Sequence, residues 1–248
     1  MSGHSHYATI KRQKESKDAQ KGQVFSRLVK EISLAARAGG GPDVNSNYKL
    51  RVAVDRARAA NMPKDNIERA ISKAIKTGGV LDEITYEGFG PQGVSVIVEA
   101  ATDNKNRTSQ EIKNIFERGG GGLGGPGSVS YNFKSQGLVI VKKENDVQSQ
   151  TLKLIESGAE DINETNDAME VYTAPADLTS IRQKIQEEGY DVISFDIVKI
   201  ANSTQTVSNA SDAEKILDFL DSINSNPDVQ KVYANLDIPE DILKQLDK

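Results

Sequence analysis

Apolar residues recur at three- and four-residue steps through the first third of the chain, and this spacing predicts three amphipathic helices. The first helix is expected over 19–38 and the second over 48–60. The third is expected to begin at Pro63, because proline has no N–H to lose in the first turn of a helix. The residues expected to face inward are Val24, Phe25, Leu28, Val29, Ile32, Ala36, Leu50, Val54, Ala57, Ile67, Ile71 and Ile75. Short helices with one apolar stripe must cover one another, so the pattern predicts a compact three-helix bundle.

Beyond Gly79 the apolar positions predict strands as well as helices. The run Val94–Val98 is typical of a buried strand, and Thr108-Ser109-Gln110-Glu111 has the spacing of a capping box that opens a helix. A second capping box, Ser211-Asp212-Ala213-Glu214, opens a helix that runs through Ile223. Further strands are expected at 128–133, 137–142, 168–173, 193–200, 204–208 and 229–236, and further helices at 147–157 and 175–188.

The order of these elements predicts how the chain divides into domains. Residues 137–200 form a complete β-α-β-β-α-β-like unit, which leaves one β-α-β piece before it and one after it. The economical arrangement pairs the two flanking pieces with each other. The expected fold class is multidomain α and α+β, with an N-terminal three-helix bundle followed by two ferredoxin-like-type α+β domains, one inserted in the other. The expected domains are a basic helical domain at 1–79, a split α+β domain at 80–135 plus 202–248, and an inserted α+β domain at 136–201.

Charge is distributed unevenly along the chain. Residues 1–78 hold 16 Lys and Arg against 7 Asp and Glu, a net charge of +9, whereas the rest holds 15 basic and 29 acidic residues, a net charge of −14. A basic domain joined to acidic ones predicts a binding site for a polyanion at the N-terminal end. The alternative is that these charges are the ordinary solvated exterior of helices.

Nucleic acid is the expected polyanion, because Lys and Arg side chains neutralise phosphates and release counterions. Nothing in the sequence identifies residues that read bases, so the expected binding is largely independent of base sequence. The residues expected to contact nucleic acid are Lys11, Arg12, Lys14, Lys17, Lys21, Arg27, Lys30, Arg37, Arg51, Arg58 and Lys64.

Other candidate sites are weaker. His4 and His6 lack a third ligand, because the chain has no Cys and only these two His, so no metal is expected. The glycine-rich stretch 118–127 lacks the lysine of a phosphate-binding loop and is expected to be a partner-contacting or merely permissive connection. The polar stretch 102–108 is expected to serve turn and N-cap roles. We therefore expect no catalytic residues, cofactor or small-molecule substrate. The alternative, an enzyme, would be detected by assays of nucleotide turnover.

Two aromatic residues, Tyr131 and Phe133, are candidates for stacking on nucleic-acid bases. Tyr131 and Phe133 alternate as stacking aromatics do in RNA-binding strands, but their surroundings lack the basic pattern of such strands, so core packing is the expectation.

The opening residues contain no apolar stretch of a signal peptide, and the longest apolar run is far shorter than a membrane span. A cytoplasmic location without a membrane partner is therefore expected.

Several longer motifs carry a resemblance to a known family. They are Gly3-His4-Ser5 with Ile10-Lys11, RAANMPKDNIERAI at 58–71, YEGFGPQGVSVIVE at 86–99, TDNKNRT at 102–108 and GSVSYNF at 127–133. In these motifs the chain resembles the YebC/PmpR family, to which the mitochondrial translational activator of cytochrome c oxidase subunit I is similar. The family usually has Lys-Trp where His6-Tyr7 stands, and a His and an Asn in the glycine loop where Gly119 and Gly122 stand.

The resemblance implies a three-domain cytoplasmic protein without catalytic activity. Some members are described as DNA-binding transcriptional regulators and others as ribosome-associated translation factors. The expected function is therefore a DNA-binding transcriptional regulatory protein. The alternative is a translation factor that binds ribosomal RNA through the basic N-terminal domain.

Overall fold

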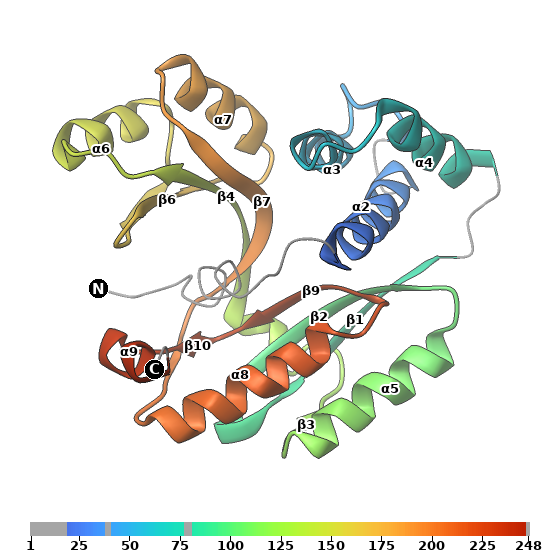
Figure 1. Cartoon of the computed structure of the whole chain (residues 1–248). Helices are drawn as coiled ribbons and strands as arrows, with labels where there is room; N and C mark the ends of the chain where they lie inside the picture. Colours follow the sequence, from blue (N-terminus) through green and yellow to red (C-terminus); the bar gives the residue numbers. More distant parts are fainter. Residues whose placement is uncertain (1–18, 38–40, 77–80, 247–248) are drawn as a thin grey trace.

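Residues 19–37, 41–76 and 81–246 are described by a computed structural model of the chain (Figure 1). The N-terminal part of these described ranges contains three helices, α2 (Ala19–Arg37), α3 (Tyr48–Ala59) and α4 (Lys64–Lys76), as the sequence predicted. Asn47 joins two of them: its side chain accepts a bond from Leu50 N at 3.1 Å and donates to Ala35 O at 2.7 Å. This buried amide therefore caps α3 and ties it to the last turns of α2.

The apolar stripes of α2 and α4 differ in part from the expectation. Val24, Val29 and Ile75 were expected inside but are 39, 36 and 54 % exposed. On α4 the small side chains Ala70 and Ala74 pack inward beside Ile67 instead. We attribute this to close helix packing, since alanines let α4 approach α2 more closely than a row of isoleucines would.

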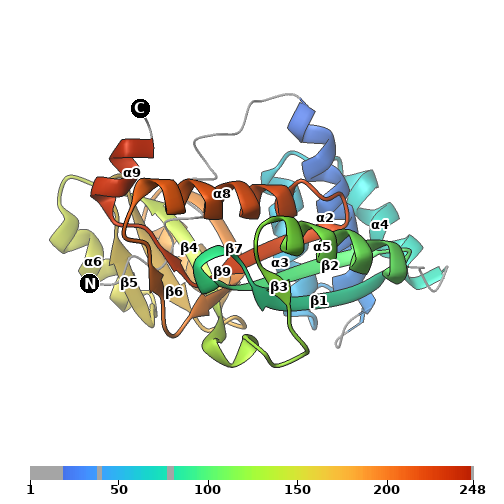
Figure 2. The same cartoon turned by 90° about the horizontal axis from the view of Figure 1, so that it is seen from below.

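The first sheet is antiparallel and has the order β3-β1-β2-β9. Its strands are β1 (Asp82–Phe89), β2 (Ser95–Thr102), β3 (Gly122–Leu123) and β9 (Val229–Ala234). Helices α5 (Lys105–Arg118) and α8 (Ala210–Asn224) cover one face, and α9 (Glu240–Leu246) packs beside α8 (Figures 1 and 2). Because β9 pairs with β2, the predicted pairing of the two flanking pieces is confirmed.

The second sheet, β5-β6-β4-β7, is also antiparallel and is formed by the chain between β3 and β9. Its strands are β4 (Phe133–Lys142), β5 (Asp161–Glu164), β6 (Ala168–Thr173) and β7 (Val192–Ala201). Helices α6 (Val147–Glu156) and α7 (Leu178–Glu187) enclose its core. Val52 of α3 is buried in this same core, so the helical region packs directly on the second sheet. The domain boundaries expected from the sequence stay a prediction.

Several expected elements are wrong. Residues 128–133 do not form a strand but contain a 3₁₀ turn, η2 (Ser130–Asn132), and 204–208 holds only the two-residue β8 (Gln205–Thr206), which pairs with β10 (Leu236–Asp237). Strands β1 and β5 were not predicted. Both capping boxes are also wrong, because α5 and α8 begin earlier, at the N-caps Asn104 and Asn209.

Glu87 explains why no strand forms around Val129. Its buried carboxylate accepts bonds from the backbone N–H groups of Gly127, Val129 and Ser130, at 2.9, 2.9 and 2.8 Å. These donors satisfy the backbone that a strand would have paired with a neighbour. Burial alone would raise the pKa of Glu87, but the three backbone donors together hold it below its ordinary value.

The glycine-rich stretch is tightly packed where it leaves α5. Phe116 and Phe219 meet edge to face, with ring centroids 5.1 Å apart. A Cβ at Gly119 would lie 2.3 Å from the Phe219 ring, and one at Gly121 would lie 2.1 Å from the Phe89 carbonyl oxygen. These positions therefore require glycine for close approach, which is a stricter role than the permissive connection expected from the sequence.

We expect Gly121→Ala to lower the free energy of unfolding by about 1–3 kcal/mol, because its Cβ overlaps backbone that cannot turn away. Gly125→Ala is the matched control in the same loop, since a Cβ there meets no atom within 4 Å. It is expected to change stability by less than about 0.5 kcal/mol. Urea unfolding of the full chain measures both; equal stabilities for the two variants would contradict the packing described.

Candidate nucleic-acid interface

The basic residues expected to bind nucleic acid fall into different surroundings. Lys11, Arg12, Lys14 and Lys17 lie outside the described residues, and Lys21 lies near the start of α2. The others either contact another part of the chain or lie on the exposed surface. The contacts of each group decide which cations are available to a phosphate.

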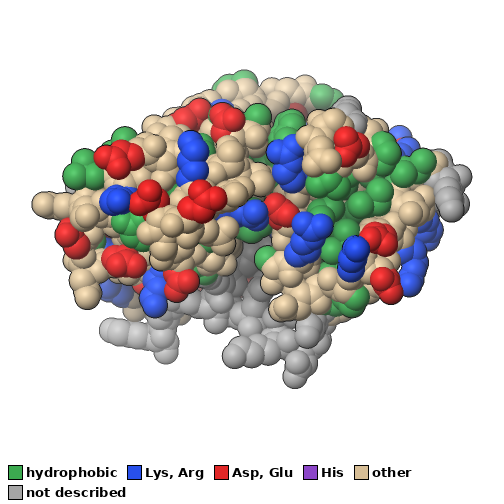
Figure 3. Space-filling view, turned by 90° about the horizontal axis from the view of Figure 1, so that it is seen from above, with side chains coloured by type: hydrophobic (Ala, Val, Ile, Leu, Met, Phe, Trp, Pro, Cys, Tyr) green, Lys and Arg blue, Asp and Glu red, His purple; other side chains and the backbone are tan. Residues whose placement is uncertain are grey.

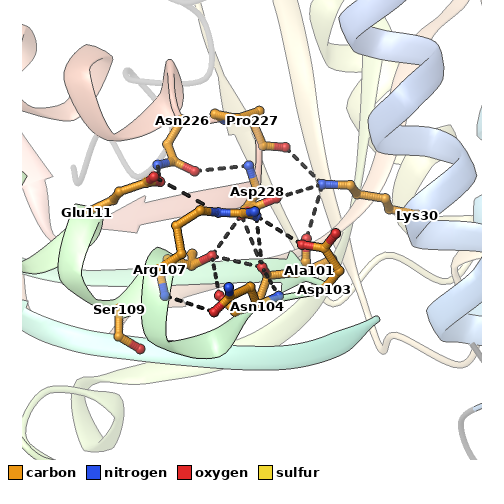
Figure 4. Close-up of polar contacts among 12 residues, drawn as sticks. Lys30, Ala101, Asp103, Asn104, Arg107, Ser109, Glu111, Asn226, Pro227 and Asp228 are labelled. Atoms are coloured by element: carbon orange, nitrogen blue, oxygen red, sulfur yellow. Dashed lines mark hydrogen bonds and ion pairs between the residues drawn. The ribbon is translucent and has the colours of Figure 1, made fainter. Parts of the chain in front are cut away.

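Lys30 of α2 is turned toward the first sheet (Figure 4), and Arg27 of α2 contacts the end of α8. The Lys30 ammonium donates to Asp228 Oδ1 at 3.1 Å, to Ala101 O at 3.1 Å and to Pro227 O at 3.0 Å. Arg27 donates to the Asn224 carbonyl at the end of α8. These two cations hold the helical region against the first sheet.

Asp228 collects donors from three elements. Its second oxygen, Oδ2, lies 2.6 Å from Arg107 Nη2, 2.7 Å from Thr108 Oγ1 and 3.1 Å from Thr102 Oγ1. Burial alone would raise the pKa of Asp228, but the bonds from Arg107, Thr108 and Lys30 lower it to about 2. The stretch 102–108, expected to serve only turn and N-cap roles, therefore also binds this carboxylate. Asn104 is the N-cap of α5, and its side chain accepts a bond from Arg107 N (Figure 4).

A second ionic contact joins the helical region to both sheets. Arg56 of α3 lies 2.7 Å from Glu31 Oε1 and 3.1 Å from Asp196 Oδ1 of β7, and Lys231 of β9 donates to the same Asp196 oxygen at 2.7 Å. Burial disfavours both charges, yet the pKa of Asp196 is lowered by Arg56 and Lys231, and that of Arg56 is raised by its two carboxylates. A cavity of about 660 Å³ lies at this junction, and its acidic and basic side chains largely pair with one another.

Arg51 and Arg37 donate hydrogen bonds to backbone carbonyl groups of connecting segments. Arg51 donates from Nε to Val44 O at 3.1 Å and from Nη2 to Asn45 O, which ties the α2–α3 connection to α3. Arg37 donates to Leu81 O at 2.9 Å, where the chain enters the first sheet. Guanidinium groups with several donors can bridge backbone in this way while still facing solvent.

Arg58 and Lys64 remain exposed at the turn between α3 and α4. Their side chains are 66 and 83 % exposed, and their ion pairs with Asp55 and Glu68 are both 3.5 Å long. Surface pairs of this kind contribute little and yield readily to a phosphate. These two residues are therefore accessible to a phosphate.

The sequence reasoning missed further exposed cations, Lys49 on α3 and two on α4. Arg69 and Lys73 lie four residues apart, on the same side of α4. Their spacing on the polar side of the predicted third helix was the available signal. We call Arg58, Lys64, Arg69 and Lys73 the α3–α4 basic surface. Asp65 and Glu68 are exposed beside it, and Figure 3 shows Lys and Arg side chains along the edge of this region with a few acidic ones among them.

The described residues contain no group of three or more His, Asp or Glu that could hold a metal ion. His4 and His6, the pair weighed from the sequence, lie outside them. None of the helices in the described ranges is long and apolar enough to cross a membrane.

We expect Asp228→Asn to remove part of the pH dependence of stability. The folded-state pKa of about 2 lies below the ordinary 3.8, so the carboxylate stabilises the fold above about pH 4 and loses this effect as the pH falls toward 2. Between about pH 5 and pH 2 the wild-type free energy of unfolding should therefore fall by about 1–2 kcal/mol more than that of the variant. Parallel urea-unfolding profiles across this range would contradict the assigned contacts.

Comparison with known proteins gives the family. Residues 5–77 match the TACO1/YebC protein N-terminal domain, and residues 81–236 match the TACO1/YebC second and third domain. A probable transcriptional regulatory protein of Dictyoglomus thermophilum is 43 % identical over 99 % of this chain and 100 % of its own length. One of Acidithiobacillus ferrooxidans is 44 % identical over 100 % of this chain and 99 % of its own.

A solved structure shows the same fold. The crystal structure of a conserved hypothetical protein from Aquifex aeolicus superposes with a TM-score of 0.82 at 39 % identity, covering 93 % of this chain and 97 % of that one. Similarity of this extent includes the helical region and both sheets. The chain is therefore a member of the TACO1/YebC family.

Proposed function

We propose that this protein is a non-catalytic, DNA-binding regulator of transcription that contacts the phosphate backbone through the α3–α4 basic surface. The names of its full-length relatives, probable transcriptional regulatory proteins, support the biological role. The observation that carries the proposal is the division of positive charge: Arg27 and Lys30 are engaged within the chain, whereas Arg58 and Lys64 are exposed.

The charge of the rest of the chain supports binding of DNA to the helical region. The +9 charge of residues 1–78 attracts a polyanion, and the −14 charge of residues 79–248 repels it, so DNA is steered toward the helical region. Contacts to phosphates position a protein on DNA but do not read sequence. The proposed surface therefore supplies affinity, and selection of one promoter requires bending preference or a further partner.

A ribosome-associated translation factor is the second candidate. The same basic surface would contact ribosomal RNA, whose phosphates offer the same chemistry. The specific observation in its favour is the acidic α+β part, which suits basic ribosomal proteins better than it suits naked DNA.

We expect reversal of Arg58, Lys64, Arg69 and Lys73 to Glu to weaken duplex DNA binding at least about tenfold at low salt. The slope of log affinity against log salt should fall by about 0.9 for each phosphate contact that is lost. Fluorescence anisotropy of labelled duplex DNA with the full chain, across a salt series, measures both quantities.

The matched control reverses Lys113, Lys142, Lys184 and Lys215, exposed lysines of the α+β part, to Glu. It changes net charge equally, so a loss shared by both variants would reject a specific α3–α4 surface. Co-sedimentation with ribosomes over the same salt series separates the two functions. Retention on ribosomes at salt that has already dissociated promoter DNA would overturn the transcriptional proposal in favour of translation.

A further inference from the structure

Tyr131 is the most exposed large hydrophobic side chain among the described residues, at 77 %. The sequence favoured core packing for this residue, and the structure shows that this expectation is wrong. An isolated exposed aromatic on a flexible loop carries little information. Tyr131, however, lies in η2, a turn whose backbone is held from both sides.

Both neighbours of Tyr131 are fixed by hydrogen bonds. On one side, Ser130 N donates to the buried Glu87 carboxylate at 2.8 Å. On the other side, the Asn132 side chain donates to Ser203 O and accepts from Ser203 N, both at 2.9 Å, and Asn132 O accepts from Asn202 N at 2.7 Å. The chain therefore presents Tyr131 from a rigid support, at low entropic cost to whatever it binds.

The segment of the chain that contains Tyr131 carries only basic charges. Residues 118–134 include Arg118 and Lys134, both exposed, and contain neither Asp nor Glu, although residues 79–248 carry a net charge of −14. The nearby Glu87 charge is buried and held by three backbone N–H groups. Figure 2 shows the segment between β3 and β4 at the edge of the molecule opposite α8, in keeping with the exposure of Tyr131.

We propose that Tyr131 stacks on an unpaired base of a single-stranded nucleic acid, with Arg118 and Lys134 beside the phosphates. The inference rests on the proposed function, since it takes nucleic acid as the ligand, and it adds a second contact on a different domain. Stacking needs a fixed aromatic face and adjacent positive charge but no base-reading groups. A protein partner is the less suitable occupant, because the polar neighbours Ser130 and Asn132 do not form the apolar patch that such interfaces bury.

The test uses the full chain with an oligouridylate and an oligothymidylate of equal length, and with duplex DNA. Tyr131→Ala should weaken single-strand binding by about 5- to 150-fold, the effect of losing one stacked base. Tyr131→Phe should retain wild-type affinity, because stacking does not require the hydroxyl. Duplex affinity should be unchanged in both variants, since paired bases are not available to stack on the ring.

A direct signal comes from Tyr131→Trp, because the chain contains no Trp and the new fluorophore is unique. Its emission should be quenched when either oligonucleotide binds, whereas Trp in place of Leu152, a 63 % exposed residue of α6, should not respond. A wild-type chain that does not bind single strands, or a Tyr131→Ala variant that binds them normally, would overturn the inference. Preference for one oligonucleotide would identify RNA or DNA as the source of the base.

These results are separable from those on the α3–α4 basic surface. If the four-residue reversal leaves duplex binding intact while Tyr131→Ala still loses single-strand binding, the proposed function fails and the stacking site stands. If the four-residue reversal weakens duplex binding while Tyr131→Ala binds single strands normally, the proposed function stands and Tyr131 is only an exposed side chain.

Discussion

The arrangement of the whole molecule depends on a few carboxylates that each bind cations from the helical region. Asp228, directly before β9 of the first sheet, pairs with Lys30 of α2, and Asp196, in β7 of the second sheet, pairs with Arg56 of α3. The side chains of Asp228 and Asp196 are only 8 and 25 % exposed, and each accepts several bonds, so their contacts are shorter and better satisfied than isolated pairs on an open surface. Loss of Lys30 would leave Asp228 paired with Arg107, and loss of Arg56 would leave Asp196 paired with Lys231, so each loss removes a contact with the helical region.

For the proposed function, these anchors limit which cations of the helical region can contact a phosphate. A cation that neutralises Asp228 or Asp196 is not available to neutralise a phosphate, so part of the positive charge of the helical region is structural. Arg58, Lys64, Arg69 and Lys73 of α3 and α4 remain exposed. The proposed contacts to nucleic acid are therefore these exposed cations and, on another part of the chain, Tyr131 of η2.

Much of this fold was predictable from local patterns. The helices and the pairing of β9 with β2 followed from spacing and element order. Strand β1 was missed because charged residues such as Asp82 and Glu83 obscure its alternation, and 128–133 was mistaken for a strand because Glu87, some 40 positions earlier, takes its N–H groups. The charge count indicated the helical region as the basic end, but it could not separate Lys30 from Lys64. The partner of Lys30 lies 198 positions away, and only the folded chain brings them together.

The most direct test of the account is lysine acetylation footprinting of the full chain with and without duplex DNA. The account predicts that DNA protects Lys64 and Lys73, while the reactivity of Lys30, bound to Asp228, stays low and unchanged. Protection that appears at Lys30 with Lys64 unaffected would contradict it, because the nucleic acid would then have to displace the contact that holds the helical region in place.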